Sequence, residues 1–321
     1  MNIVLTGSVA FDYLMTFPGY FRDHILPDRL DTISLSFLVD TMVRQRGGVA
    51  PNIAYALALL GERPHLMATV GEDFGEYRLW LESVGIDTSA TRIIKGEFTA
   101  SFFVNTDLSN NQIASFYIGA MAHATELSFH NWQGEKPDLV VISPNAPEAM
   151  KRYAVECQEL SIPYIYDPSQ QILRLEGEDL RGGIQGAVAL FVNAYEFGLI
   201  QNKTGWSIKD VLKQVKFLVI TLGEKGSTIY TKTAQYQVPT VTPHQITDPT
   251  GGGDAFRGGF LAGYSRGLDL PTCSQMGALA ATYCLEQKGT QNYTYTSEQF
   301  VARFRENFDD QGKLDVFMKR K

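Results

Sequence analysis

The stretch Asp248-Pro249-Thr250-Gly251-Gly252-Gly253-Asp254-Ala255-Phe256-Arg257 is the most informative part of this 321-residue sequence. Three successive glycines precede an aspartate and a run of small and apolar residues that is compatible with a helix. The start of such a helix presents unpaired N–H groups and a partial positive charge, which suit a phosphate or a developing anion. Because a Cβ would block close approach, glycine fits this role. The stretch therefore predicts an anion-binding helix start at Gly251, Gly252 and Gly253.

Asp254 stands where that helix is expected to begin. An aspartate there is often only a helix cap. A carboxylate beside an anion-binding helix start is also well placed to accept the proton of a hydroxyl group that attacks phosphorus. The sequence has no G-x-x-x-x-G-K-[ST] motif and no G-x-G-x-x-G after its first strand, so phosphates must be held in another way. Asp254 is therefore the candidate catalytic base.

The rest of the chain predicts an α/β fold. Short apolar runs at residues 3–5, 139–142, 164–166, 189–192 and 217–221 alternate with helical patterns. This alternation indicates a doubly wound, mostly parallel sheet flanked by helices. Apolar residues make up 44% and charged residues 20% of the chain, an ordinary globular balance. We find no internal repeat or long linker, so we expect one cooperative body.

Two further runs, at residues 98–104 and 112–118, predict a β-hairpin, because the intervening residues 105–110 are rich in turn formers. Side chains alternate between faces along a strand, so each run has a largely apolar face. That face could pack on the core, or the hairpin could be a lid over a flat ligand. Residues 35–39 are a candidate third strand, which a stable small sheet requires.

These patterns predict a division of the chain into two parts. Residues 1–11, 48–96 and 120–321 would form the α/β body. Residues 12–47 and 97–119 would form a small β-sheet lid. The exposed edges of such a lid sheet suggest that it joins two copies of the chain in a homodimer.

Asp12 follows the first predicted strand, where ligands bind in open α/β sheets. Its carboxylate could accept hydrogen bonds from two adjacent hydroxyls, although a surface turn is the simpler explanation of an aspartate there. The run from Arg46 through Gly47, Gly48 and Asn52 precedes an apolar helical pattern and could bring backbone and amide groups to sugar hydroxyls. A plain junction between a loop and a helix is the alternative.

Two strand ends suggest where a nucleotide and its metal could bind. Asn193 and Glu196 follow the run at 189–192, and an amide and a carboxylate at this spacing can orient waters around Mg²⁺. Taken alone, the two residues are explained more simply as a helix start, with Asn193 as the cap and Glu196 completing a capping pair. Thr221, Gly223 and Gly226 could form a glycine turn beside a nucleotide, or an ordinary turn after a strand.

Composition excludes several classes of protein. The formal net charge of −7 and the pI near 5.3 argue against nucleic acid as a partner. No run of 18 apolar residues and no signal-peptide pattern is present, so we expect a cytoplasmic protein without a membrane partner. Three cysteines without CxxC spacing, Cys157, Cys273 and Cys284, argue against disulfides and structural zinc and suggest buried, reduced thiols.

These motifs, in this order, resemble the ribokinase-like (PfkB) carbohydrate kinase family over essentially the whole chain. The run at 47–54 with Gly61 is similar to the first family signature, Asn193 and Glu196 to its N-x-x-E motif, and the run at 248–254 to its terminal D-T-x-G-A-G-D signature. Two residues depart from that last signature, Pro249 for the usual Thr and Gly252 for the usual Ala. Neither change removes an amide from the anion site unless the nitrogen of Pro249 is needed.

Within the family, the segments TGSVAFDYLMTFPG, RGGVAPN, IASFYIGAM, YDPSQQ and DPTGGGDAFR most resemble the adenosine kinases of actinobacterial type. The resemblance implies ATP- and Mg²⁺-dependent phosphorylation of the 5′-hydroxyl of adenosine to AMP. It places Asp12, Gly48 and Asn52 on the ribose. It places the following residues around the base: Ser8, Ser36, Phe102, Phe116, Gln170 and Gln171.

The same resemblance implies that ATP lies near Asn193, Thr221, Gly223 and Gly226. Asp248 and Thr250 would lie at a monovalent-cation site, with a potassium requirement left open, Glu196 would hold Mg²⁺ through water, and Arg174 would contact a phosphate. Two alternatives remain. One is another kinase of this family acting on ribose, a fructose phosphate, inosine or cytidine, and the other is a non-catalytic nucleoside-binding module.

Overall fold

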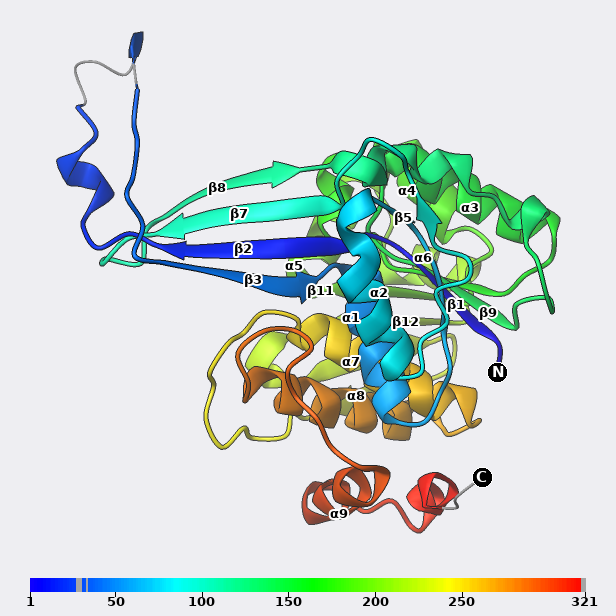
Figure 1. Cartoon of the computed structure of the whole chain (residues 1–321). Coiled ribbons are helices and arrows are strands. Elements are labelled where there is room, and N and C mark those ends of the chain that lie inside the picture. Colours follow the sequence, from blue (N-terminus) through cyan, green and yellow to red (C-terminus); the bar gives the residue numbers. More distant parts are fainter. Residues whose placement is uncertain (27–30, 33, 319–321) are drawn as a thin grey trace.

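An eight-stranded sheet forms the centre of the molecule (Figure 1). The computed structural model describes residues 1–26, 31–32 and 34–318. The strand order is β14-β13-β12-β11-β10-β9-β1-β4, and all neighbours from β12 to β4 are parallel, whereas β13 and β14 are antiparallel. Its strands are β1 (Ile3–Thr6), β4 (His65–Met67), β9 (Leu139–Ile142), β10 (Tyr164–Tyr166), β11 (Ala189–Asn193), β12 (Phe217–Thr221), β13 (Ser227–Thr231) and β14 (Gln235–Val238). The predicted parallel strands are therefore confirmed.

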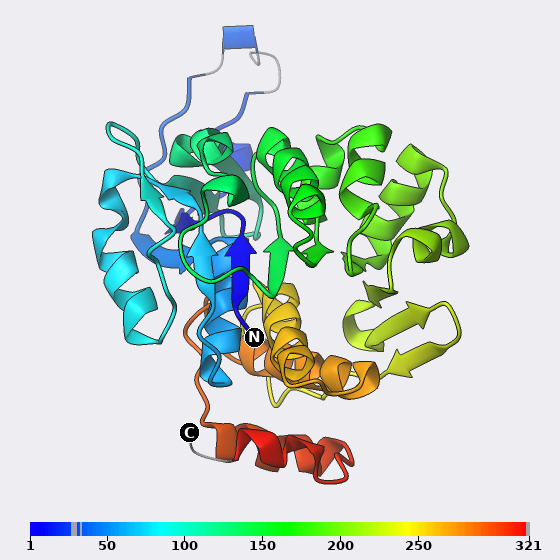
Figure 2. The same ribbon diagram turned by 90° about the vertical axis from the view of Figure 1, so that its right-hand side faces the viewer.

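Helices cover both faces of this sheet (Figure 2). Alternate residues of the parallel strands enter two separate apolar clusters, as expected for a sheet that is buried on both sides. One layer consists of α1 (Val49–Leu59), α2 (Gly75–Ser83), α7 (Gly252–Ser265) and α8 (Leu270–Leu285), and α9 (Ser297–Asn307) packs on α8 outside this layer. The other consists of α3 (Pro147–Glu159), α4 (Gly177–Ile184), α5 (Ala194–Thr204) and α6 (Ile208–Gln214). In the described residues no helix has both the length and the apolarity to cross a membrane.

The connections change direction at β1. The chain runs from β1 to its neighbour β4 on one side, and then continues through β9, on the other side of β1, to β10, β11 and β12. Ligands in open α/β sheets bind beyond the carboxyl ends of the strands at such a reversal. The segments that follow β1, β9 and β10 therefore meet where a site is expected.

A second sheet of four strands extends away from the body, in the order β3-β2-β7-β8 (Figure 1). Its strands are β2 (Ala10–Thr16), β3 (Thr41–Gly47), β7 (Ala100–Thr106) and β8 (Gln112–Tyr117). The predicted hairpin is confirmed as β7 and β8. A short pair, β5 (Thr69–Val70) and β6 (Arg92–Ile93), makes a third sheet.

The prediction of a strand at residues 35–39 was wrong. The strand that joins the hairpin is β2, which pairs with β7, and the next strand of the sheet is β3, which begins only at Thr41. Phe37 instead packs its ring against Phe17 and Phe21, and Leu38 is 86% exposed. Phe37 thus belongs to a local aromatic cluster rather than to a strand of the sheet. Residues 27–30 and 33 of the expected lid lie outside the described residues.

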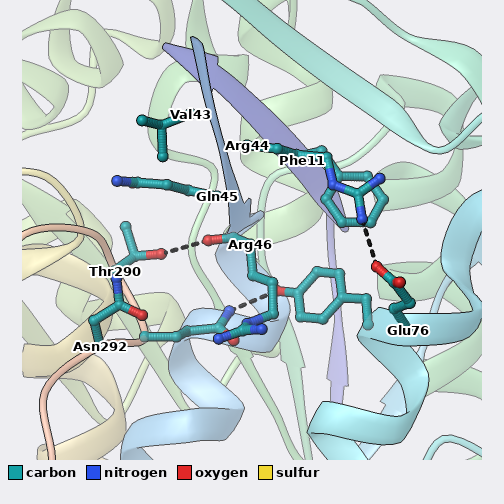
Figure 3. A pocket seen from close by; sticks show the side chains of 10 residues that line it. Phe11, Val43, Arg44, Gln45, Arg46, Glu76, Thr290 and Asn292 are labelled. Atoms are coloured by element: carbon teal, nitrogen blue, oxygen red, sulfur yellow. Dashed lines mark hydrogen bonds and ion pairs between the residues drawn. The ribbon is translucent and has the colours of Figure 1, made fainter. Parts of the chain in front are cut away.

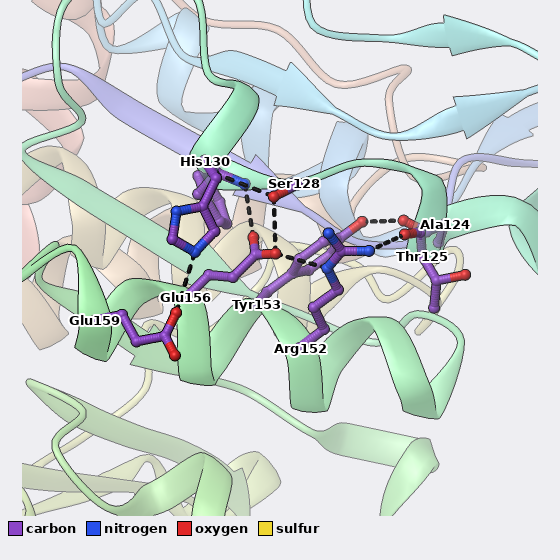
Figure 4. A network of polar contacts seen from close by, with 9 residues as sticks. Ala124, Thr125, Ser128, His130, Arg152, Tyr153, Glu156 and Glu159 are labelled. Carbon is purple, nitrogen blue, oxygen red and sulfur yellow. Dashed lines mark hydrogen bonds and ion pairs between the residues drawn. The ribbon is translucent and has the colours of Figure 1, made fainter.

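A polar network anchors the segment that leads from β8 back to the body, the 3₁₀ helix η4 (Gly119–Glu126) (Figure 4). The buried carboxylate of Glu156 on α3 accepts hydrogen bonds from the Ser128 hydroxyl at 2.8 Å and from Arg152 Nε at 2.6 Å. Arg152 also donates to the Thr125 carbonyl at 2.6 Å. Because a charged acceptor makes strong hydrogen bonds, this network fixes the body end of the small sheet.

Close packing sets the position of α7. Its N-cap residue, Gly251, has φ +80°, a conformation that favours glycine, and a Cβ there would lie 2.7 Å from Thr290 Cγ2. Further along the helix, a Cβ on Gly258 would lie 2.4 Å from the Cβ of Ala56 on α1, and one on Gly259 would lie 2.6 Å from the Met276 carbonyl on α8. The glycines therefore hold α7 between α1 and α8.

Candidate active site

A cavity of about 370 Å³ lies between the small sheet and the start of α7. We call it the lid-side cavity. Most of the residues that the sequence pointed to line it: Ser8, Asp12, Gly48, Asn52, Phe102, Phe116, Gln170, Gln171, Arg174, Thr250, Gly251 and Asp254. Ala10, Val49, Met121, Pro144 and Thr290 complete the wall. Segments far apart in the sequence are thus brought together at the carboxyl ends of the parallel strands.

The small sheet presents one face to this cavity. Asp12 on β2 is in register with Phe102 on β7, which is in register with Phe116 on β8. Paired residues of neighbouring strands share a face, so a carboxylate and two rings form one row across the sheet. Phe116 is 53% exposed, which leaves its ring available to a ligand.

Asp254 lies in the first turn of α7, and its side chain is partly buried. Asn52 Nδ2 on α1 donates a hydrogen bond to Asp254 Oδ2 over 2.9 Å. Burial raises the pKa of Asp254 to about 6, against the lowering effects of the Arg257 guanidinium and the Asn52 hydrogen bond. A pKa near the working pH suits a general base, because the group is ionised at neutral pH and still holds a proton well.

Arg257 is a residue whose role the sequence reading missed. Its Nη2 donates to Asp167 Oδ1 over 2.7 Å, and Asp167, which directly follows β10, is fully buried. Burial raises the pKa of Asp167 to about 7, and the Arg257 guanidinium acts in the opposite direction. An arginine within the small and apolar run of α7 was the available signal, since such a charge needs a buried partner.

Asp12 is also largely enclosed. Burial, followed by the nearby charge of Asp248, raises the pKa of Asp12 to about 6. A Cβ on Gly47 would lie 2.5 Å from Asp12 Oδ2, so the glycine of β3 leaves room for this carboxylate.

A second cavity, of about 330 Å³, opens on the other side of the α7 start. We call it the β12-side cavity. Thr221, Gly223 and Gly226 line it, as do Gly252 and Gly253. Its remaining wall is largely apolar: Glu224, Thr240, Val241, Pro243, Ile246, Pro249, Phe256, Ala278, Ala281, Thr282 and Leu285. The start of α7 therefore stands between two cavities, with Gly251 and Asp254 facing one and Gly252 and Gly253 facing the other.

Asn193 and Glu196 form the helix-capping pair that was one of the two interpretations. Glu196 N donates to Asn193 Oδ1 at 2.8 Å, and Asn193 N donates to Glu196 Oε2 at 2.7 Å. Neither residue lines the two cavities. The carboxylate of Glu196 is nevertheless close enough to Asp254 to raise its pKa.

The donor set around α7 is compatible with Mg²⁺ only through water. Within the described residues, no three His, Cys, Asp or Glu side chains are gathered so as to hold a metal ion themselves. Each carboxylate oxygen of Glu196 accepts one protein hydrogen bond, Oε1 from the Ser169 hydroxyl at 3.2 Å and Oε2 from Asn193 N. A lone pair on each oxygen thus remains for a water, and Mg²⁺ usually keeps several waters and completes its shell with phosphate oxygens.

The loop before α7 holds the candidate cation residues. Asp248 Oδ1 accepts from Thr250 N at 2.9 Å, and its Oδ2 accepts from Gly289 N at 3.0 Å. The structure thereby ties this loop to the segment that follows α8.

Ser36, expected beside the base, is not brought to either cavity. It is exposed, and it lies before Thr41, at the end of β3 that points away from the body, whereas β3 reaches the body at Gly47. The whole length of the strand therefore separates Ser36 from the lid-side cavity in this conformation (Figure 1).

The fold and the two cavities around one glycine-rich helix start define a ribokinase-like phosphotransferase that acts on a hydroxyl group. The model of the pfkB family of carbohydrate kinases matches residues 9–297, and the chain belongs to this family.

Three relatives show how close the likeness is. The nucleoside kinase of Burkholderia thailandensis, solved in complex with inosine, superposes with a TM-score of 0.85 at 35% identity over 95% of this chain and 98% of that one. The nucleoside kinase of Methanocaldococcus jannaschii is 31% identical over 94% of this chain and 96% of its own length. The cytidine kinase of Thermococcus kodakarensis is 30% identical over 92% of this chain and 99% of its own length.

Proposed function

We propose that this chain is a nucleoside kinase that transfers the γ-phosphoryl group of ATP to the 5′-hydroxyl of adenosine. The observation that carries the proposal is the position of the α7 start between two cavities. Asp254 and Gly251 line the one that holds the candidate nucleoside residues, and Gly252 and Gly253 line the one that holds the candidate ATP residues. In-line transfer between two substrates requires such a junction.

In the lid-side cavity, Asp12, Gly48 and Asn52 bind the ribose. Phe102 and Phe116 stack on the base, while Ser8, Gln170 and Gln171 contact its polar edge. Arg174 contacts the transferred phosphate. The small sheet acts as a lid over the nucleoside, which excludes water from the transfer.

In the β12-side cavity, Thr221, Gly223 and Gly226 bind ATP, with Asn193 at the neighbouring strand end. Asp254 accepts the proton of the 5′-hydroxyl as its oxygen attacks phosphorus. The N–H groups at Gly251, Gly252 and Gly253 stabilise the negative charge that develops in the transition state. Glu196 would hold Mg²⁺ through water, and the metal, when bound, would neutralise charge on the phosphates. Asp248 and Thr250 would hold a monovalent cation.

The test is ADP production by the purified chain with Mg-ATP and a panel of acceptors: adenosine, inosine, cytidine, ribose and fructose 6-phosphate. We expect the highest kcat/KM with adenosine. Preference for a free sugar would contradict a nucleoside kinase, and absence of ADP release with every acceptor would favour a non-catalytic nucleoside-binding module.

Inosine is the second candidate acceptor. The B. thailandensis relative, similar over almost its entire length, was solved in complex with inosine. Adenine and hypoxanthine differ at the 6-position, where one carries an amino donor and the other a carbonyl acceptor. The amides of Gln170 and Gln171 can satisfy either group by rotating, so the ratio of the two kcat/KM values decides between the acceptors.

We also propose that the lid sheet joins two copies of the chain. Met42 is 63% exposed, Phe103 38% and Ile113 43%, and all three lie on one face of this sheet. An exposed apolar face of this kind favours association. Light scattering on the purified protein should give twice the mass of the chain, and the substitution Phe103→Asp should lower it.

A further inference from the structure

A chain of hydrogen bonds leads from Trp80 on α2 to the proposed base. Gln291, in the segment between α8 and α9, is only 2% exposed. Trp80 Nε1 donates to Gln291 Oε1 over 3.2 Å, and Gln291 Nε2 donates to Asn52 Oδ1 over 2.9 Å. Asn52 Nδ2 then donates to Asp254 Oδ2 over 2.9 Å. The partly buried Trp80 and the buried Gln291 and Asn52 thus connect in one direction to the carboxylate at the start of α7.

The direction of this chain follows from its members. An indole N–H can only donate, so the atom of Gln291 that faces Trp80 must be its oxygen. The amide nitrogen of Gln291 then faces Asn52, which must offer its own oxygen and is left with its NH₂ group toward Asp254. Neither amide could be rotated by 180° without placing two donors or two acceptors against each other, and such a mismatch is costly in a buried network.

A second contact fixes the same orientation independently. The Tyr77 hydroxyl donates to the Gly47 carbonyl over 2.9 Å, because a carbonyl can only accept. Its oxygen therefore receives a hydrogen bond, which Gln291 Nε2 supplies over 2.5 Å. Tyr77 is 1% exposed, so water does not replace this donor. Trp80 requires the oxygen of the Gln291 amide on its side, and Tyr77 requires the nitrogen on its own side. The two contacts therefore agree on the orientation in which this nitrogen also faces Asn52.

The segment that carries Gln291 is itself held against the small sheet. The hydroxyl of the preceding residue, Thr290, donates to the Arg46 carbonyl at 3.1 Å (Figure 3). Gln291 also lines a polar cavity of about 330 Å³ together with Phe11, Arg44, Arg46 and Glu76. In that cavity Arg44 already pairs with Glu76 at 2.7 Å, and Arg46 lies over the Trp80 ring at 4.2 Å. The Thr290 contact therefore ties the segment that carries Gln291 to β3.

We infer that Gln291 is a positioning residue of the kinase: it holds the Asn52 side chain so that its NH₂ group, and not its carbonyl, faces Asp254. This inference rests on the proposed role of Asp254 as the base. With the NH₂ group toward it, the ionised carboxylate is stabilised and oriented; with the carbonyl toward it, Asp254 would have to keep a proton to make a hydrogen bond and could not accept one from the substrate. Asn52, which also lines the lid-side cavity, transmits the effect of Gln291 to Asp254.

The kinetic test compares Gln291→Met, which keeps the length of the side chain and removes both the acceptor and the donor of its amide, with Gln158→Met. Gln158 makes comparable hydrogen bonds to Tyr164 Oη at 3.0 Å and the Gln185 carbonyl at 2.8 Å, on the other face of the sheet. We expect Q291M to lower kcat about tenfold at neutral pH, as for the loss of one hydrogen bond to a charged group, and to change KM less. Q158M should keep the wild-type kcat.

The pH profile separates positioning from a merely structural role. The charged groups that act on Asp254 are Arg257 on the same helix, Glu196 on α5 and Asp167 after β10, and Q291M leaves all three in place. Losing the Asn52 donor raises the pKa of Asp254, so the deficit of Q291M should shrink as the pH rises. A deficit that is constant at every pH, or a wild-type kcat, would overturn the inference.

A stability cycle tests the inference even if no nucleoside is phosphorylated. Melting temperatures are compared for wild type, Q291M, D254N and the double variant. If Gln291 acts through Asn52 on the carboxylate, Q291M should cost less stability in the D254N background, because no charge there depends on the Asn52 donor. Additive effects of the two substitutions would contradict the inference. Absence of activity in wild type together with a coupled cycle would instead refute the proposed function alone.

Discussion

Arg257 Nη2 lies 2.7 Å from Asp167 Oδ1, and this buried pair joins α7 to the end of β10 one helical turn after Asp254. The side chains are 11% and 0% exposed. The pair therefore fixes the first turn of α7 relative to the sheet and supplies a positive charge beside the proposed base. Mutation can separate the contribution of this pair to the stability of the fold from its effect on the pKa of Asp254.

Arg257→Met should lower the free energy of unfolding by roughly 3–5 kcal/mol, because it leaves Asp167 buried without a partner. The double variant R257M/D167L removes both charges and should recover much of this loss. In both variants Asp254 loses the guanidinium that lowers its pKa, so the onset of activity should move to higher pH. Urea denaturation and pH–rate profiles measure the two effects. A double variant as unstable as R257M would show that the pair is not the source of the loss.

The pH dependence of kcat should report Asp254. The base must be ionised to accept a proton, and burial raises its pKa to about 6. The rate should therefore be nearly constant above neutral pH and fall as the pH is lowered through about 6. Asp12 also has a pKa raised to about 6, so Asp12→Asn is the control: it should raise KM and keep the acid limb of kcat. A kcat that does not fall on acidification would argue against Asp254 as the base.

The two glycines at the start of α7 should respond differently to alanine. Gly251 has φ +80° and its Cβ would meet Thr290, so Gly251→Ala should cost more than about 1 kcal/mol of stability and most of the activity. Gly252 lies inside the helix, and a Cβ there meets only the Leu285 side chain at 3.2 Å. Gly252→Ala should therefore keep activity and raise the free energy of unfolding by up to about 1 kcal/mol. Thermal melts and kcat for both variants provide the comparison, and equal losses would contradict it.

The stacking role of Phe116 predicts a change in nucleoside affinity. Phe116→Leu should raise KM for adenosine up to roughly tenfold with little change in kcat, since stacking contributes about 0.5–1.5 kcal/mol. Phe103→Leu is the matched control, because Phe103 lies on the opposite face of the sheet, where its ring stacks on Tyr13. If both variants change KM equally, the cavity-facing side of the sheet is not the binding surface.

Much of the fold was predictable from local patterns. Each parallel strand from β9 to β12 is a short apolar run, because a strand that is buried on both faces of a sheet requires apolar residues at nearly every position. The hairpin of β7 and β8 was predictable from its two strand-like runs and the turn residues between them, although every residue of β8 is exposed. The prediction of a strand at residues 35–39 was wrong because Phe37 packs in a local aromatic cluster. The alternation of apolar and polar residues does not reveal such a tertiary contact.

The candidate site was predictable where a residue closely follows a predicted strand or begins a helix: Asp12 lies shortly after β1, on β2, and Asp254 lies in the first turn of α7. Arg257 and Gln291 were missed, because their importance lies in partners that are distant in the sequence, Asp167 and Asn52. The mutual capping of Asn193 and Glu196 was one of the two interpretations of the sequence, and it leaves a lone pair on each carboxylate oxygen of Glu196 for a water.

The rate of phosphoryl transfer by Asp254→Asn, measured in a single turnover with saturating Mg-ATP and adenosine, tests the central claim most directly. The substitution keeps the size of the side chain and removes its ability to accept a proton. We predict a rate lower by about 10²- to 10⁴-fold with nearly unchanged adenosine binding. A variant that transfers phosphate at the wild-type rate would show that the proton leaves by another route.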